Sequence, residues 1–166
     1  MAMIDEGNLG AWVLKCNPEV YDLRAAVEAG IDHVDSWSVR PGYRADLMRA
    51  GQKALLWVSG DGRRLARGIW GVGWVEGGVR RLDGQDEDRG HWVDQAARRS
   101  VRLAVPLWVP VLAEPVTVAE VRAAGLADLE VLRMPQGANP SWASTEQLET
   151  LEHLLPEWPA RRPHPA

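Results

Sequence analysis

Apolar runs alternate with polar, turn-forming segments along this chain, and four of the runs predict strands. Residues 10–15, 53–58, 68–75 and 100–109 are rich in aliphatic, β-branched and aromatic side chains, a composition typical of strands. Residues 53–58 are apolar at almost every position, which indicates a central strand that is buried on both faces. Residues 31–39 alternate in part and predict a further strand or extended segment.

Glycine and proline refine this prediction. The glycines of 68–75 indicate bulges or a close approach of two backbones, and Pro106 indicates an edge or a bulge. Residues 76–97 are rich in glycine and charge and predict an exposed hairpin connection. Residues 129–132 predict a last short strand, followed by a turn-rich loop at 133–142.

Helical spacing and capping signals predict four short helices. Residues 20–29 carry apolar residues at helical spacing, and 43–50 form a similar segment that ends at a glycine. The patterns at 117–120 and 144–147 are capping boxes, each of which predicts a helix start. The second is followed by leucines that give the helix one apolar face: Leu148, Leu151, Leu154 and Leu155.

The order of these elements predicts a curled α+β domain. Strands and helices are mixed without regular βαβ alternation, which argues against a doubly wound parallel sheet, and no internal repeat occurs. The folded domain is expected to span 10–155. A flexible N-terminus at 1–9 and a flexible tail at 156–166, rich in proline and arginine, are expected to flank it.

Composition narrows the class of protein. The 166 residues, 46% hydrophobic and 25% charged, fit one ordinary globular domain. No run of 18 apolar residues and no signal-like start occurs, so we expect neither a membrane span nor secretion, and a cytoplasmic location. The single cysteine, Cys16, excludes an intramolecular disulfide. The net charge of −4 argues against a nonspecific nucleic-acid coat and leaves a local basic patch open.

Aromatic usage is unusual, with nine Trp, two Tyr and no Phe. Trp combines a large flat face with an N–H donor, so some of these rings either fill the core or form a stacking surface. Trp12, Trp70 and Trp74 lie in predicted strands and are expected to pack. Trp37 and Trp57 fit either role, and Trp142 is a packing residue or a lid.

Five segments, in this order, resemble the EVE domain family. Residues 12–18 resemble its W-x-x-K-S-E-P start, and 37–51 resemble W-x-V-R-N-Y-x-A-R-x-x-M-x-x-G-D. Residues 54–59 are similar to L-x-F-Y-x-S, and 68–75 to G-I-x-G-I-G-x-V. The loop at 136–140, followed by a helix, fits the family's ending, so the resemblance covers about 11–155.

The resemblance implies a PUA-like fold, a small mixed or antiparallel β-barrel flanked by short helices. It also implies recognition of a modified base in DNA or RNA. We expect this recognition to occur without catalysis, cofactor or metal. Two departures lie where the pocket wall is expected. The family's S-E is Cys16-Asn17 here, and Pro41-Gly42 precedes the tyrosine where an asparagine is usual. The identity of the bound base therefore stays open.

A pocket for one flat base needs stacking surfaces and a few polar edge contacts. The aromatic residues on the matched segments nearest the expected mouth are Trp37, Tyr43 and Trp57. The candidate edge contacts are Cys16 through its backbone, Asn17, Ser38, Ser59 and Asn139. Asn17 and Asn139 both precede proline, and helix capping is the alternative role for each.

Basic residues near the same mouth are candidate phosphate contacts. Arg40 and Arg44 are suited to hold flanking phosphates, with a solvated helix face as the alternative. Lys15 matches the family's lysine and either meets a phosphate or is an edge residue with its amine in water.

Catalytic patterns are weak. Cys16 has no His or Asp at a recognised spacing, and no P-loop, dinucleotide fingerprint or G-x-S-x-G pattern occurs. Two other functions stay open besides a base reader. One is a binder of a free nucleoside-like metabolite, or a small enzyme, using the same cavity. The other is a protein-interaction module that displays the 76–97 segment.

Overall fold

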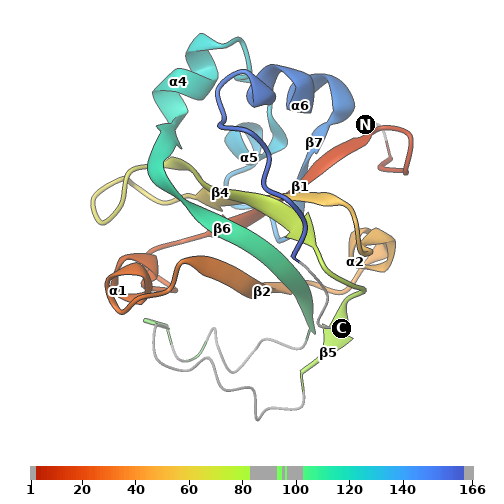
Figure 1. Cartoon of the computed structure of the whole chain (residues 1–166), viewed down its shortest axis with the longest axis horizontal. Helices are drawn as coiled ribbons and strands as arrows, with labels where there is room; N and C mark the ends of the chain where they lie inside the picture. The colour runs from red at the N-terminus through yellow and green to blue at the C-terminus, as the bar shows by residue number, and fades with distance from the viewer. Residues whose placement is uncertain (1–2, 83–92, 95, 97–102, 163–166) are drawn as a thin grey trace.

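A mixed sheet of seven strands forms the centre of the computed structural model, which describes residues 3–82, 93–94, 96 and 103–162 (Figure 1). Its strand order is β2-β6-β4-β3-β1-β7, and β5 pairs with β6. The β1–β3 pair is parallel and the other pairs are antiparallel. The strands are β1 (Leu9–Cys16), β2 (His33–Val39), β3 (Lys53–Val58), β4 (Gly68–Val75), β5 (Arg80–Arg81), β6 (Leu103–Thr117) and β7 (Ser141–Ser144).

Five short helices accompany the sheet in the part of the chain that the structure describes. They are α1 (Leu23–Glu28), α2 (Tyr43–Leu47), α4 (Val118–Ala123), α5 (Glu130–Arg133) and α6 (Thr145–Glu152). Both predicted capping boxes are present, with Thr117 bonded reciprocally to Glu120 and Ser144 to Gln147. Figure 1 shows α4, α5 and α6 gathered on one side of the sheet, with β2 and α1 on the other.

Two predicted elements differ from the structure. The strand predicted at 129–132 is wrong, because the segment is α5, in which Met134 N–H donates to the Glu130 carbonyl at 2.7 Å. One helical turn is too short for hydrophobic spacing to separate helix from strand. Strand β6 continues to Thr117, eight residues past its predicted end, and the predicted 100–102 lie outside the described residues.

Most of the segment predicted as an exposed connection, 76–97, also lies outside the described residues, and its described part contains β5. The bulge indicated by Pro106 is confirmed. The register of β2 against β6 shifts between Val34 and Ser36, and Ser36 lies opposite Pro106.

Alternation along β1 and β3 divides the interior into two apolar layers. Trp12 and Leu14 face one layer, which extends towards β2 and α1, whereas Val13 faces the other, which lies beneath α4, α5 and α6. On β3, Leu56 faces the first layer and Trp57 the second. Since both faces of these strands are covered, their sequences are almost continuously apolar.

The strand order is an open path that begins at β2 and ends at β7. Within the described residues no strand ladder joins these two ends, so the structure confirms the α+β class and does not confirm a closed barrel. Side chains of β2 and of the loop before β7 bring the ends together, as the next subsection describes.

The tail packs against β4 through two indole rings. Trp158 Nε1 donates to the Gly73 carbonyl at 3.0 Å, and Trp74 Nε1 donates to the Pro159 carbonyl at 2.8 Å. The two rings meet edge to face with centroids 6.4 Å apart. Residues 158–159 therefore make specific contacts, within a segment predicted to be flexible. No helix in the described part of the chain is long and apolar enough to cross a membrane.

Close contact between β4 and β6 predicts a sharp difference between two glycines. A Cβ added at Gly73 would lie 2.0 Å from the Trp108 carbonyl oxygen, whereas one added at Gly78 meets nothing within 4 Å. We expect Gly73→Ala to lower the free energy of unfolding by about 2–3 kcal/mol, in the range typical of overpacking. Gly78→Ala should leave it almost unchanged. Urea unfolding measures both, and equal stabilities would contradict the β4–β6 contact.

Candidate functional site

The backbone of Lys15, near the end of β1, is the point at which β2 and the 134–140 loop meet β1. Trp37 Nε1 donates to the Lys15 carbonyl oxygen at 3.0 Å, and Asn139 Nδ2 donates to the same oxygen at 3.0 Å. The Lys15 N–H donates to Asn139 Oδ1 at 2.7 Å. We call these three residues the β1 joint.

Asn139 acts in the joint as a short piece of strand. β7 pairs with β1 from Leu9 to Val13 and stops there. The side-chain amide of Asn139 then supplies the donor and the acceptor that the next ladder position needs, because an amide group presents both. Its backbone carbonyl also accepts the Arg40 N–H at 3.0 Å. The amide is therefore committed to β1 and is not a free edge contact for a base.

Trp37 is held on two sides. Its N–H is bonded to Lys15, and its ring packs edge to face on Tyr21 with centroids 5.3 Å apart and planes at 70°. The ring packs against the first apolar layer and is only half-buried. The structure therefore presents part of one indole in a fixed orientation at the surface.

Two of the predicted polar contacts keep hydrogen-bonding capacity that the described part of the chain does not use. Asn17 is exposed, and its Oδ1 accepts the Glu19 N–H at 3.0 Å, which leaves its amide N–H groups as donors. Ser38 follows Trp37 on β2 and is half-buried, and because neighbouring strand residues face opposite sides its side chain lies on the other side of β2 from the ring. Ser59 donates through its N–H and its hydroxyl to the Cys16 carbonyl, at 2.9 and 3.3 Å, so the backbone of Cys16 is occupied.

The Cys16 side chain is enclosed. It is 1% exposed, and its Sγ lies 3.8 Å from the Tyr21 carbonyl oxygen. Burial, and to a lesser extent the nearby Asp22 carboxylate, raises the pKa of the Cys16 thiol to about 12. Cys16 is therefore a protonated core residue, and neither its side chain nor its carbonyl is free to read a base.

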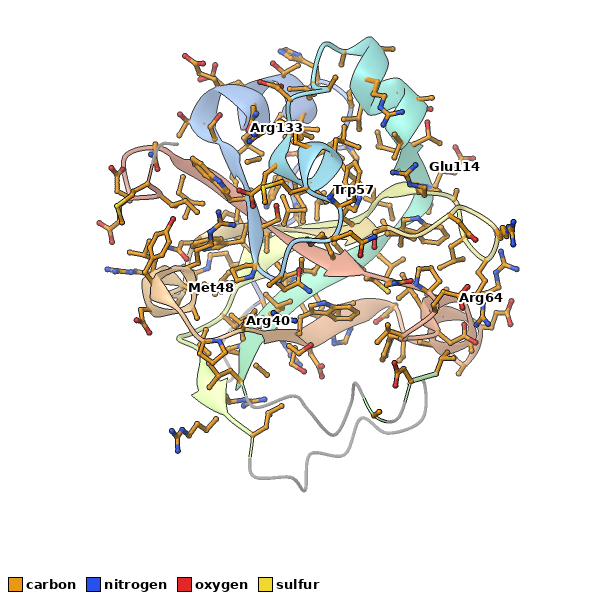
Figure 2. All side chains as sticks on the ribbon, turned by 180° about the vertical axis from the view of Figure 1, so that it is seen from behind. Arg40, Met48, Trp57, Arg64, Glu114 and Arg133 are labelled. Atoms are coloured by element: carbon orange, nitrogen blue, oxygen red, sulfur yellow. The ribbon has the colours of Figure 1, made fainter. Side chains whose placement is uncertain are left out.

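Trp57 and Tyr43 are not brought to Trp37. Trp57 is 2% exposed and lies in the second layer, near α5 (Figure 2). Because neighbouring strand residues face opposite sides, its ring points away from the layer on which Trp37 packs. The prediction that Trp57 lines the pocket is wrong. Tyr43 is 43% exposed at the start of α2, and no ring contact joins it to Trp37 among the described residues.

Two of the three predicted phosphate contacts are committed elsewhere. Arg44 binds Glu130 through both guanidinium Nη groups, at 2.6 and 2.8 Å, and also the Pro140 carbonyl at 3.1 Å. The Ser141 hydroxyl donates to the same carboxylate at 2.9 Å. Burial raises the pKa of Glu130, but the bonds from Arg44 and Ser141 outweigh it and hold that pKa below its usual value.

Lys15 as a whole residue is 9% exposed, and its side-chain amine donates to the Gly137 carbonyl. Burial lowers the pKa of Lys15, and the nearby Glu130 carboxylate opposes that shift. Arg40, by contrast, is exposed at the end of β2. It is the one predicted phosphate contact whose guanidinium carries no bond within the described residues.

A cavity of about 370 Å³ lies away from the β1 joint. The side-chain amide of Gln52, one of its lining residues, is already hydrogen-bonded. It accepts from Trp12 Nε1 and from the Arg49 N–H, and it donates to the Leu47 carbonyl. The residues that line it are Glu6, Leu9, Gly10, Arg49, Ala50, Gly51, Gln52, Lys53 and Trp74. In the described parts of the chain, no group of three or more His, Cys, Asp or Glu residues is placed to hold a metal ion.

Comparison with known proteins supports this architecture. The sequence profile of the EVE domain matches residues 10–146. The fold is similar to a protein of Pseudomonas syringae, with a TM-score of 0.58 and 14% identity over 87% of this chain and 98% of that one. It is similar to the DUF55 domain of human thymocyte nuclear protein 1, with a TM-score of 0.55 and 14% identity over 87% and 97%.

A protein of Rhodopseudomonas palustris gives a TM-score of 0.52 and 21% identity over 85% of this chain and 89% of that one. At these identities the likeness concerns the fold alone. No curated protein sequence matches this chain.

The two ion pairs of Arg44 and Arg49 should differ in their effect on stability. In the Arg44–Glu130 pair the side chains are 28% and 11% exposed, whereas in Arg49–Glu6 they are 58% and 65% exposed. We expect Arg44→Ala to cost about 2–3 kcal/mol of unfolding free energy, because it leaves a mostly buried carboxylate unpaired. Arg49→Ala should cost less than about 1 kcal/mol. Chemical denaturation compares them, and similar losses would refute the structural role of Arg44.

Because the Cys16 thiol is buried, we expect the folded protein to lose stability at alkaline pH. The thiol pKa rises from 9.0 to about 12 on folding. Between these values the unfolded chain has released the proton and the folded chain keeps it. The buried thiol therefore makes its full contribution to the unfolding free energy below about pH 9, and that contribution falls by about 1.4 kcal/mol per pH unit above it. Unfolding free energies of wild type and Cys16→Ala, measured from pH 8 to about pH 11, should converge as pH rises. A constant difference would contradict the burial of the thiol.

Proposed function

We propose, from the fact that this chain belongs to the EVE domain family, that it is a nucleic-acid-associated module which holds one modified base against Trp37. The family resemblance implies recognition of modified bases in DNA or RNA. The observation that supports a position for this site is the β1 joint, which fixes a half-buried indole at the surface against Lys15, two residues before the exposed Asn17.

A fixed ring suits this task for an energetic reason. Stacking of one base on an aromatic side chain contributes about 1–3 kcal/mol. A mobile ring loses part of that energy in becoming ordered. Trp37 is already oriented by its bond to Lys15 and its contact with Tyr21, so most of the stacking energy remains available for binding.

Discrimination between bases is assigned to Asn17. It carries a short side chain that donates and accepts, and it lies two residues after Lys15 in the chain. Ser38 is left out, because its side chain lies on the opposite side of β2 from Trp37. A site built to pair a polar base edge rejects a base that lacks it, because the protein group is then left unpaired. Asn139, Cys16 and Ser59, by contrast, are engaged with backbone groups and contribute by holding the segment in place.

We also propose that the site acts without catalysis. General acid–base or nucleophilic chemistry needs an ionisable group whose protons or lone pair are free to reach a substrate. Here the buried thiol is protonated, and the Glu130 carboxylate is bonded to Arg44 and Ser141. These observations support a binding role for the surface around Trp37.

Substitution of Trp37 tests the proposal. Short oligonucleotides of one sequence, carrying at the centre a methylated or hydroxymethylated cytosine, a methylated adenine or the plain base, are titrated as DNA and as RNA. We expect wild type to prefer one modification. Trp37→Leu should weaken that complex by about 5- to 150-fold, the equivalent of a lost stacking contact. Trp37→Phe keeps an aromatic face without the N–H and should lose less.

Trp74→Ala serves as the control, since Trp74 is also half-buried but lies at the cavity away from the joint. Equal binding of all modified and plain oligonucleotides by wild type would refute the proposal. Loss of preference in Trp74→Ala with retention in Trp37→Leu would move the site to the cavity. Binding of the free modified nucleoside as tightly as the oligonucleotide would favour a metabolite binder.

A further inference from the structure

The connection between β3 and β4 brings a group of arginines to the segment that follows the β1 joint. We call residues 60–67 the arginine loop, because it carries Arg63, Arg64 and Arg67 against one acidic residue, Asp61. This is a local excess of positive charge in a chain whose net charge is −4.

The loop is attached next to Asn17. Ser59, which precedes it, donates twice to the Cys16 carbonyl. A Cβ added at Gly60 would lie 3.4 Å from Pro18 and 3.5 Å from Asn17 Oδ1, so the two backbones are adjacent. Arg64 Nε lies 3.3 Å from the Glu19 carboxylate. The arginine loop therefore borders the 16–19 segment, which carries Asn17 and directly follows Lys15 of the β1 joint.

The guanidinium groups of Arg63 and Arg64 are available to a ligand. Their side chains are 87% and 49% exposed, and each meets its carboxylate through Nε at a distance above 3.2 Å. Neither guanidinium makes a hydrogen bond in the described part of the chain, although the Arg63 backbone N–H donates to Asp61 Oδ1 at 2.9 Å. Exposed pairs of this kind contribute little, and a phosphate accepting two N–H bonds from one guanidinium competes well with them.

Arg67 adds positive charge that is not neutralised nearby. It is half-buried, its Nε has no hydrogen-bond partner, and no ion pair to it occurs among the described residues. Its backbone carbonyl accepts the Val118 N–H at 3.0 Å, which fixes the end of the loop against α4. A loop anchored at both ends holds its arginines in place more firmly than a free one would.

Arg40 lies on the other side of the candidate site. Figure 2 shows Arg40 near the end of β2 and Arg64 near α1, on the same view of the molecule, with β2 running between them. Arg40 follows Val39, the last residue of β2, and Trp37 lies three positions before it. Positive charge is thus available on both sides of the strand that carries the stacking ring.

We propose that the arginine loop, through Arg63 and Arg64, binds the phosphodiester backbone on one side of the recognised base, while Arg40 binds it on the other. The inference rests on the proposed function and deepens it, because it makes the partner a polynucleotide strand rather than a free nucleoside. It also gives phosphate binding to exposed arginines, in place of Lys15 and Arg44.

The salt dependence of binding tests this directly. The probes are a short single-stranded DNA with plain bases and an RNA of the same sequence, titrated over a range of salt concentrations. Each phosphate contact on a single strand contributes about 0.7 to the slope of log affinity against log salt. We expect R63A and R64A each to reduce the slope by about 0.7, and the double variant by about 1.4. The variant R63K/R64K keeps both charges and should keep the slope.

The matched control is R122A, which removes an exposed arginine of the same charge on α4. A slope that is unchanged in R63A/R64A, or reduced equally in R122A, would overturn the proposal. So would a wild-type protein that does not bind either plain strand at low salt. If only the proposed function fails, the salt slope still depends on Arg63 and Arg64. In that case no modified base is preferred over the plain one, and Trp37→Leu does not change the affinity.

Discussion

The fold and the candidate site both depend on the carbonyl oxygen of Lys15. This one acceptor receives N–H groups from Trp37 on β2 and from Asn139 in the loop before β7. These two elements lie at or beside opposite ends of the strand order. The curl of the sheet is therefore held by these side-chain hydrogen bonds, together with the backbone bond from the Arg40 N–H to the Asn139 carbonyl, at a place where no strand ladder joins the two ends in the described structure. The same bonds that draw β2 onto β1 also set the orientation of the indole, so architecture and binding surface share one cause.

Burial separates the residues that build the site from those that are free to act. Glu130, Arg44, Ser141 and the Lys15 amine are satisfied by one another or by backbone carbonyls, and they hold α2, α5 and β7 against β1. The exposed cations Arg40, Arg63 and Arg64 keep N–H groups that a ligand can use, since their partners are weak or lacking in the described structure. An overall negative charge is compatible with nucleic-acid binding when the positive charge is gathered at the site in this way.

Much of this could be predicted from the sequence, and the failures have physical reasons. The strands at 53–58 and 68–75 and both capping boxes are confirmed, because they depend on local patterns. The role of Trp57 could not be predicted. The alternation of side chains along a strand shows that consecutive residues face opposite sides of the sheet, but it does not show which side carries the site. Asn139 looked like a cap or an edge contact because its partner, Lys15, is 124 positions away. The arginine loop was missed because its position beside Asn17 arises only from the packing of β3 next to β1.

The most direct test of the central claim is the NMR signal of the Trp37 indole N–H, observed in protein labelled with ¹⁵N on tryptophan. If the bond to Lys15 holds the ring as a stacking surface, this proton exchanges slowly with solvent. Its signal should also shift on addition of the preferred modified oligonucleotide, while the Trp57 signal stays in place. Rapid exchange of the Trp37 proton, or a shift confined to Trp74, would contradict the account.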